Sequence, residues 1–185
     1  MGCDECMSWN LLKRESLVDT RWVKVRKDSV ELPNGEIIED FYTVTIQETA
    51  AIVAITPDKN IILKKEFRYT YGEDLIEVPA GTFEPGETDG LAVAKRELLE
   101  ETGYVSDEWM YLGPTVESSS KLTNHMHIYF ANNCRRVSGQ HLDDTEIMDL
   151  MVVPLAQAVE MVMTNEICCN SSAHGIMRVA RMLNI

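Results

Sequence analysis

Residues 80–104 of this chain read AGTFEPGETDGLAVAKRELLEETGY, and their second half has the pattern of an amphipathic helix. Apolar side chains recur there at positions i, i+3 and i+7, which share one helical face; they are Leu91, Ala94 and Leu98. Either Thr88 or Asp89 can cap the start of the helix, because both side chains accept hydrogen bonds from free backbone N–H groups. Gly103 is expected to end it, since glycine readily adopts the left-handed conformation of a helix C-terminus.

Three glutamates lie close together on this helix. Glu97, Glu100 and Glu101 are spaced i, i+3 and i+4, so their carboxylates share one face. Like charges at this spacing destabilise a helix by about 0.2–0.5 kcal/mol per pair, and acidic residues in the last turn oppose the helix dipole. A hard divalent cation such as Mg²⁺ or Mn²⁺ removes both penalties, because it prefers oxygen ligands. The pattern therefore predicts a metal site, with a solvated acidic face as the alternative. Replacing Glu101 by glutamine should relieve part of the repulsion.

The residues that flank the glutamates are typical of a ligand-binding loop. Gly81 and Gly86 bracket a segment whose backbone can approach a ligand closely. Glu87 comes just before the helix, at its positive end. Arg96 can pair with a carboxylate and fix its orientation.

Together these residues resemble the Nudix box, G-x5-E-x7-R-E-U-x-E-E-x-G-U, in which U is aliphatic. The matching positions are Gly81, Glu87, Arg96, Glu97, Leu98, Glu100, Glu101 and Gly103. Tyr104 replaces the final aliphatic residue, and eight residues instead of seven separate Glu87 from Arg96. The extra residue lies within 88–92, where Gly90 can best absorb a local distortion. The insertion bears on where Glu87 lies relative to the carboxylates that follow it.

Motifs outside the box resemble the ADP-ribose pyrophosphatase group of this family. They are Lys65–Tyr69 (KEFRY), Glu77–Gly81 (EVPAG), His127–Ala131 (HIYFA) and Asp144–Glu146 (DTE). The proline that this group usually carries past the box is absent, and Glu117–Ser120 (ESSS) occupies its neighbourhood. Another nucleoside diphosphate sugar, such as GDP-mannose or ADP-glucose, is therefore the alternative substrate.

The resemblance implies a set of site residues. The implied metal ligands are the carbonyl of Ala80 and the carboxylates of Glu97, Glu100 and Glu101. The implied catalytic residues are Glu146 as general base, Glu100, Arg96 and Glu87. The implied substrate contacts are Arg68, Trp22, Tyr69 and Gly81. The residues alone leave other roles open: Glu146 as a solvated loop acid, and Arg68 as a plain surface arginine. Trp22 and Tyr69 could equally be core or interface aromatics.

The rest of the chain predicts an ordered set of strands and helices. An N-terminal hairpin is expected from residues 21–32 and 36–46, joined by the turn Pro33-Asn34-Gly35. Further strands are expected at 49–56, 61–68, 74–78, 109–112, 125–131 and 148–153, and helices at 155–163 and 173–183. His125 and His127 share one face of a strand and are interpreted as structural, or at most pocket-lining.

This order of elements indicates a mixed α/β (α+β) fold. By the resemblance it is a Nudix-type α/β/α sandwich with a mixed sheet, preceded by the antiparallel hairpin. We expect an N-terminal tail and hairpin at residues 1–46 and the Nudix hydrolase domain at 47–185.

The composition disfavours several classes of protein. Acidic residues outnumber basic ones 30 to 17, and the formal charge of −13 repels nucleic acid. No apolar run approaches the roughly 18 residues of a membrane span. The five cysteines cannot all pair within one chain, which indicates a reducing cytosol. Cys3 and Cys6 form a lone C-x-x-C that we expect in an exposed, reduced tail rather than in a metal site.

The resemblance also implies what the protein does. A hydrolase of this group uses Mg²⁺ or Mn²⁺ to cleave the pyrophosphate bond of ADP-ribose or a related sugar, and yields a nucleoside monophosphate and a sugar phosphate. A Nudix-fold regulator that binds such a ligand without cleaving it is the alternative from another class. Such a module is expected to have lost box carboxylates, which this chain keeps. A homodimer built partly by the N-terminal hairpin is implied as well.

Overall fold

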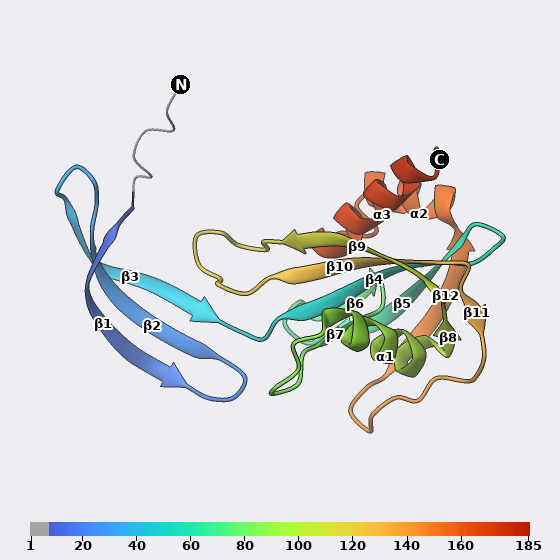
Figure 1. Ribbon diagram of the computed structural model, residues 1–185, viewed down its shortest axis with the longest axis horizontal. Helices are drawn as coiled ribbons and strands as arrows, with labels where there is room; N and C mark the ends of the chain where they lie inside the picture. The colour runs from blue at the N-terminus through green and yellow to red at the C-terminus, as the bar shows by residue number, and fades with distance from the viewer. Residues whose placement is uncertain (1–7) are drawn as a thin grey trace. The chain divides into compact units, whose positions relative to one another are not determined.

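The computed structural model describes residues 8–185 and divides into two compact units (Figure 1). The first unit runs up to Gln47 and also contains Ser118–Asn124. The second consists of Glu48–Glu117 and His125–Ile185. The loop 118–124 thus clusters with the N-terminal unit, although it lies within the expected domain 47–185. The expected tail with Cys3 and Cys6 lies outside the described residues.

The first unit is a three-stranded antiparallel sheet of β1 (Asn10–Asp19), β2 (Lys24–Glu31) and β3 (Ile37–Thr45). The predicted hairpin is confirmed as β2 and β3, with Gly35 in the turn at φ 85°. β1 is an additional strand in a segment expected to belong to the tail.

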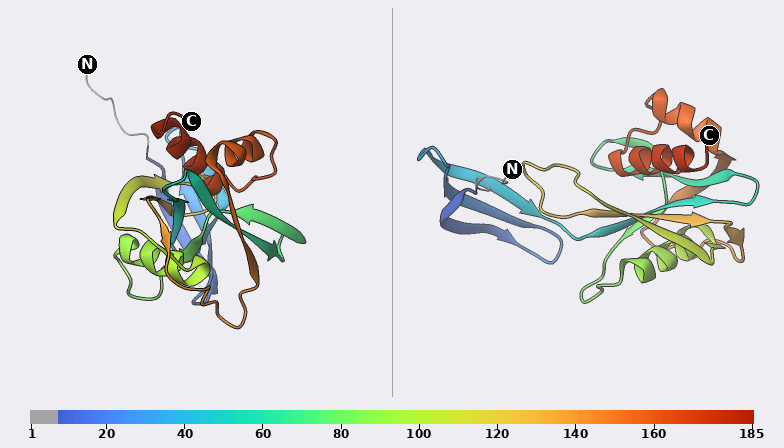
Figure 2. Two further views of the ribbon diagram at one scale, coloured as in Figure 1. Left: turned by 90° about the vertical axis from the view of Figure 1, so that its right-hand side faces the viewer. Right: turned by 45° about the horizontal axis from the view of Figure 1, so that its top comes forward.

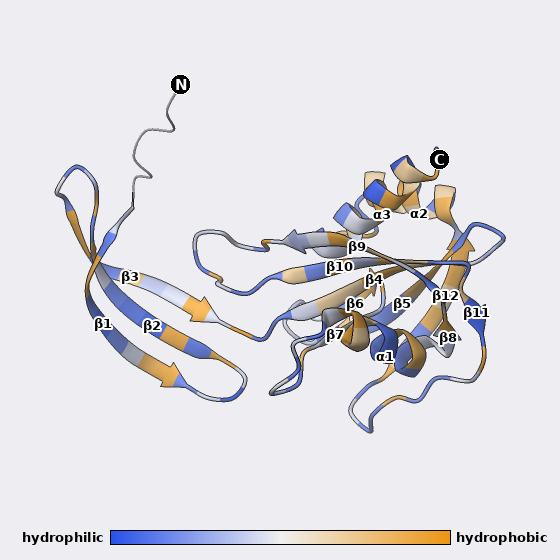
Figure 3. Ribbon diagram, viewed as in Figure 1, coloured by the Kyte–Doolittle hydropathy of each residue, from blue (hydrophilic) through white to orange (hydrophobic). Residues whose placement is uncertain are grey.

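Two irregularities explain why β1 escaped the sequence pattern. Its register on β2 shifts between Leu11 and Lys13 and again between Ser16 and Val18. Each shift breaks the strict alternation of faces, so its apolar residues come in adjacent pairs instead of at every second position. Polar and apolar residues are accordingly mixed along β1 and β2 (Figure 3).

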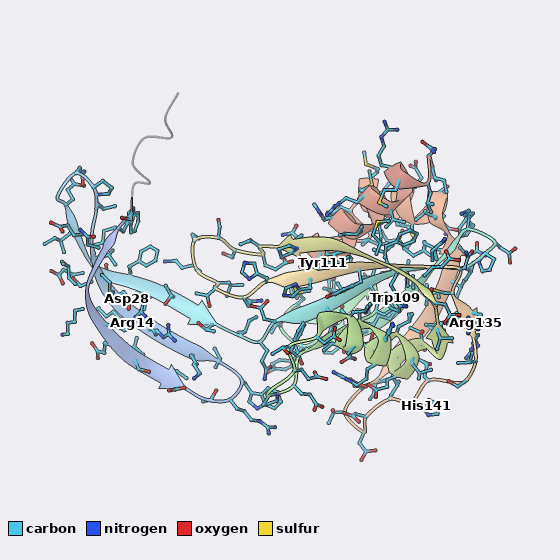
Figure 4. The ribbon with its side chains drawn as sticks, in the orientation of Figure 1. Arg14, Asp28, Trp109, Tyr111, Arg135 and His141 are labelled. Atoms are coloured by element: carbon cyan, nitrogen blue, oxygen red, sulfur yellow. The ribbon has the colours of Figure 1, made fainter. Side chains whose placement is uncertain are left out.

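A partly buried, two-pronged ion pair joins β1 to β2. Arg14 donates through Nε and Nη2 to the two carboxylate oxygens of Asp28, over 2.9 and 2.7 Å (Figure 4). The Asp28 carboxylate is buried, and its hydrogen bonds from Arg14 lower its pKa below the usual value. This two-pronged contact fixes the register that the apolar pattern of β1 leaves weakly specified.

The second unit is built on a mixed sheet with strand order β12-β5-β4-β10-β9, in which β6 also pairs with β5 and β7 with β4. Its strands are β4 (Thr49–Ile55), β5 (Asn60–Arg68), β6 (Glu73–Glu77), β7 (Ala80–Thr82), β9 (Glu108–Thr115), β10 (Met126–Asn132) and β12 (Met148–Pro154). β4 and β10 are parallel, and the other pairs are antiparallel. A small ladder joins β8 (Tyr104–Val105) to β11 (Arg135–Arg136).

Helices cover both faces of this sheet, as Figure 2 shows. They are α1 (Gly90–Thr102), α2 (Leu155–Met163) and α3 (Asn170–Met182). Alternate residues of β4 supply the two cores: Ala51, Val53 and Ile55 pack with α2 and α3, and Ala50, Ile52 and Ala54 pack with α1. The predicted α/β/α sandwich with a mixed sheet is therefore confirmed. Among residues 8–185, no helix is long and apolar enough to cross a membrane.

The ends of α1 follow the predicted capping. Asp89 is the N-cap, and its Oδ1 accepts from the backbone N–H groups of Leu91 and Ala92 over 3.0 and 3.2 Å. Gly103 closes the helix at φ 73°. A Cβ atom at Gly103 would lie 2.4 Å from the carbonyl oxygen of Ser138, so the position requires glycine for space as well as for conformation. These two caps fix where α1 begins and ends.

Candidate functional site

Arg96 gathers three of the box carboxylates. Its Nη1 lies 2.7 Å from Glu97 Oε1 and 3.3 Å from Glu100 Oε2, and its Nη2 lies 3.2 Å from Glu87 Oε2. The backbone N–H of Glu84 also donates to Glu87, over 2.7 Å. One guanidinium therefore joins the loop before α1 to the acidic face of the helix, in spite of the extra residue between Glu87 and Arg96.

Glu97 is the buried member of this group. Its carboxylate packs directly over Gly81, where an added Cβ atom would fall 1.9 Å from the Glu97 Cδ. Burial raises the pKa of Glu97, although the Arg96 guanidinium acts in the opposite direction. The negative charges of Glu100 and Glu146 raise this pKa further. Glu146, which is 49 residues further along the chain, therefore lies near the cluster.

Glu101 lies deeper and contacts a different cation. It forms a buried ion pair with Lys64 of β5, and both residues are only 2% exposed. The backbone N–H of Ala80 donates to Glu101 Oε2 over 2.9 Å. Burial raises the pKa of Glu101 to about 7, against the opposing effects of Lys64 and of the Ala80 N–H. The Glu101 carboxylate is therefore only partly compensated by the charges of the chain itself.

A second layer of charges surrounds this pair. The Lys64 Nζ lies 3.3 Å from Glu66 Oε2, a buried oxygen with no hydrogen-bond donor among the described residues. Arg68 binds the other oxygen of Glu66 at 3.0 Å and donates from Nε to Glu77 over 2.8 Å. Lys64, Glu66 and Glu77 have no role that could be assigned from the sequence. The adjacent pair Lys64-Lys65 could have revealed the buried lysine. Neighbouring residues of a strand point to opposite faces, so one of the two lysines must face inward.

The predicted site residues fall into two sets. The structure brings together Ala80, Gly81, Glu87, Arg96, Glu97, Glu100 and Glu101, with Arg68 and Glu146 close by. Tyr69 is 90% exposed after the end of β5. Trp22 belongs to the N-terminal unit, where it is also exposed and the Arg21 guanidinium lies 4.1 Å from the centre of its ring.

A pocket of about 480 Å³ opens beside the start of α1. Its lining is largely aromatic and consists of Glu48, Phe83, Glu87, Thr88, Gly90, Tyr111, His127 and Tyr129. The Tyr111 hydroxyl lies 2.8 Å from His127 Nδ1, and His127 Nε2 lies 3.0 Å from Glu48 Oε2. Tyr111 extends from β9 in Figure 4. His127 therefore lines a pocket, which is one of the two roles expected for it from the sequence.

The donor atoms of the cluster fit a hard divalent cation. Carboxylate oxygens and a backbone carbonyl are the ligands that Mg²⁺ and Mn²⁺ prefer, and the box supplies both types. The buried Oε2 of Glu66, which accepts no hydrogen bond within the described residues, adds a further acceptor. Within residues 8–185, no three His, Cys, Asp or Glu side chains are already arranged as a metal centre. The carboxylates instead turn toward Arg96 and Lys64, so binding a cation requires them to reorient.

Comparison with known proteins places the chain in a family. Residues 45–167 match the NUDIX domain, and residues 9–44 match the nucleoside diphosphate sugar hydrolase N-terminal domain. The chain therefore belongs to the Nudix family, as the box predicts.

Named relatives and a solved structure extend this result. The chain is 32% identical to the methanol dehydrogenase activator of Bacillus methanolicus, over 82% of this chain and 81% of the relative. It is 28% identical to the ADP-ribose pyrophosphatase of Bacillus subtilis (strain 168), over 89% of each. A crystal structure of an ADP compounds hydrolase matches with a TM-score of 0.82 and 21% identity, over 97% of each chain, and supports the fold.

The raised pKa of Glu101 predicts how stability depends on pH without metal. Between the usual glutamate value and about 7, the folded chain holds a proton that the unfolded chain has released. The free energy of unfolding should therefore fall as the pH rises through this window, by on the order of 3 kcal/mol for this one group. Glu101→Gln should remove the part of this decrease in unfolding free energy that Glu101 causes. Denaturant titrations in chelator at several pH values measure both proteins.

Glu100→Gln is the matched control, since its carboxylate lies on the same helix face but is 44% exposed. It keeps Glu101 and should therefore keep the part of the fall that Glu101 causes. Parallel profiles for the wild type and Glu101→Gln would contradict a raised pKa of Glu101.

Proposed function

We propose that this chain is a divalent-metal-dependent hydrolase that cleaves the pyrophosphate bond of ADP-ribose or a related nucleoside diphosphate sugar. Its products are then a nucleoside monophosphate and a sugar phosphate. The observation that carries the proposal is the cluster of Glu87, Glu97 and Glu100 around Arg96, with Glu101 buried beside it. The match of residues 9–44 to a nucleoside diphosphate sugar hydrolase domain supports the substrate class.

Glu97 and Glu101 are the proposed principal metal ligands, with Glu100 and the carbonyl of Ala80 completing the set. A bound Mg²⁺ or Mn²⁺ neutralises phosphate oxygens and lowers the pKa of a bound water. Arg96 orients Glu97 and Glu87, because its planar guanidinium holds both carboxylates at defined positions. Glycine at position 81 leaves the space that the Glu97 carboxylate occupies.

Glu146 is the proposed general base that takes a proton from the attacking water. Its charge contributes to the raised pKa of Glu97, which supports a place near the metal ligands. A turn with Asp143 holds it, since Glu146 N donates to Asp143 O and Asp143 N donates to Glu146 Oε2, over 2.9 and 3.0 Å. Glu87 is the alternative base, but it already accepts from Arg96 and from the Glu84 N–H.

Four residues are proposed to contact the substrate: Arg68, Trp22, Tyr69 and Gly81. The Arg68 guanidinium lies between the carboxylates of Glu66 and Glu77 and can also bind a phosphate oxygen. Trp22 and Tyr69 are exposed aromatics, and such rings can stack on a nucleobase. The Gly81 backbone lies beside Glu97 and can approach a bound phosphate closely.

Two other functions are possible for a chain with this fold. A preference for another nucleotide sugar, such as GDP-mannose, is the enzymatic alternative and shares the same metal site. A non-catalytic Nudix-fold regulator is the other. The complete set of box carboxylates, organised by Arg96, favours an enzyme, because a binding module has no need to keep such a strained acidic cluster.

We propose a homodimer in the cytosol, with the domain boundary between residues 46 and 47. The first unit exposes large apolar side chains on a small sheet, which supports burial against another chain; they include Leu11, Leu12, Leu17, Trp22 and Ile37. The free thiols of Cys134, Cys168 and Cys169 fit a reducing compartment.

The activity itself is tested on purified protein with a panel of nucleotide sugars and dinucleotides. With Mg²⁺ or Mn²⁺, we expect release of a nucleoside monophosphate from ADP-ribose or a close analogue. Chelation and Glu97→Gln should each lower the rate by orders of magnitude, because they remove the cation or one of its ligands. Full activity in chelator would refute the metal-dependent mechanism. Binding of these ligands without cleavage would favour the regulator.

The base is tested by Glu146→Gln. We expect kcat to fall by about 10²–10⁴-fold, the range for general acid–base catalysis, while Mn²⁺ affinity stays close to that of the wild type. Glu87→Gln is the comparison. The assignment is wrong if Glu87→Gln has this effect on kcat and Glu146→Gln does not.

The dimer is tested by light scattering. We expect close to twice the chain mass of 21.0 kDa, because the exposed apolar residues of the first unit should be covered. A fully active monomer at nanomolar concentration would rule out a shared active site.

A further inference from the structure

Lys64 is a buried charged residue at the end of an apolar stretch of β5. It follows Ile61, Ile62 and Leu63, all fully buried, and it is itself only 2% exposed. Its neighbours across the sheet are Glu77 on β6 and Leu150 on β12. An apolar residue would continue the core at this position without desolvating a charge. Packing alone therefore does not account for a lysine here.

The Lys64 ammonium is surrounded by oxygens instead. Its Nζ forms the buried ion pair with Glu101 Oε1 and lies 3.3 Å from Glu66 Oε2 and 3.5 Å from the Ala80 carbonyl oxygen. Two carboxylates and a backbone carbonyl are also typical ligands of a hard divalent cation. Glu101 and Ala80 are, moreover, two of the metal ligands proposed above.

We propose that Lys64 is a positioning residue of the metal site, a fixed internal cation that holds Glu101 and the Ala80 carbonyl in place of one divalent ion. Because Lys64 occupies the place of one ion, the carboxylate cluster binds fewer divalent ions than the same oxygens would bind without this lysine. This inference rests on the proposed function, because it assigns Lys64 a role at the same metal site.

The two internal cations differ in what they hold. Arg96 is partly exposed and joins the carboxylates of Glu97 and Glu100 on α1 to that of Glu87 in the loop before the helix. Lys64 is buried beneath the helix, where a positive charge acts strongly on its neighbours because little water screens it. A divalent ion that approaches Glu101 therefore meets one positive charge already in place. Removing that charge should increase the affinity of the cluster for such ions.

The test measures bound Mn²⁺ per chain at fixed free Mn²⁺, from the electron paramagnetic resonance signal of unbound Mn²⁺ at pH 8. Lys64→Met removes the charge and keeps an unbranched side chain. Lys65→Met is the matched control, because Lys65 is adjacent on β5 and pairs with Asp74 at 3.2 Å in a half-exposed position. Lys64→Arg keeps the charge, and Lys64→Gln is the second neutral variant if Lys64→Met fails to fold.

Lys64→Met should bind more Mn²⁺ per chain than the wild type, with an association constant higher by about tenfold or more. Lys65→Met and Lys64→Arg should follow the wild-type curve. Equal or weaker Mn²⁺ binding by both neutral variants would overturn the proposal. The same holds if Lys64→Arg behaves like Lys64→Met, because the charge would then not be the cause.

The outcome is separable from that of the proposed function. If the neutral variants gain Mn²⁺ but the wild type cleaves no nucleotide sugar, the hydrolase proposal fails and the role of Lys64 stands. If nucleotide sugars are cleaved and all the binding curves coincide, only the role of Lys64 fails.

Discussion

The crowding of negative charge on α1 is the constraint on which the rest of the site depends. Glu97, Glu100 and Glu101 occupy one face of the helix, and burial removes much of the water that would screen two of them. Arg96 and Lys64 offset part of this charge. Burial nevertheless raises the pKa of Glu97 and of Glu101, and the negative charges of neighbouring glutamates add to this effect. A carboxylate cluster that its own chain leaves undercompensated is a strong site for a divalent cation.

The fold creates this crowding by a few close approaches. The short strand β7 pairs with β4 and brings Ala80 and Gly81 against the acidic face of α1. Gly81 leaves the space that the Glu97 carboxylate needs, and Gly103 lets the chain turn sharply after the last glutamate. The helix is held by the apolar core on one side of β4, so its charged face cannot rotate away from the loop. The packing of the sandwich thus holds the glutamate carboxylates together, although they repel one another.

Much of this could be predicted from local sequence. The limits of α1 and the shared face of the glutamates follow from spacing and capping over short distances, whereas the mixed sheet was implied by the resemblance to the Nudix family. β1 escaped prediction because its two register shifts break the alternation. The ion pair of Lys64 with Glu101 joins residues 37 positions apart, and periodicity carries no information about which strand residue meets which helix residue. The same applies to Glu146, whose place near Glu97 depends on the path of a long loop.

The central claim is that a divalent cation binds between the carboxylates of Glu97 and Glu101. Anomalous scattering from a crystal equilibrated with Mn²⁺ tests it most directly. The account predicts an anomalous peak in direct contact with oxygens of both carboxylates, with Glu97 moved away from Arg96. A peak elsewhere in the protein, or no peak while Glu97 stays bound to Arg96 and Glu101 to Lys64, would contradict it.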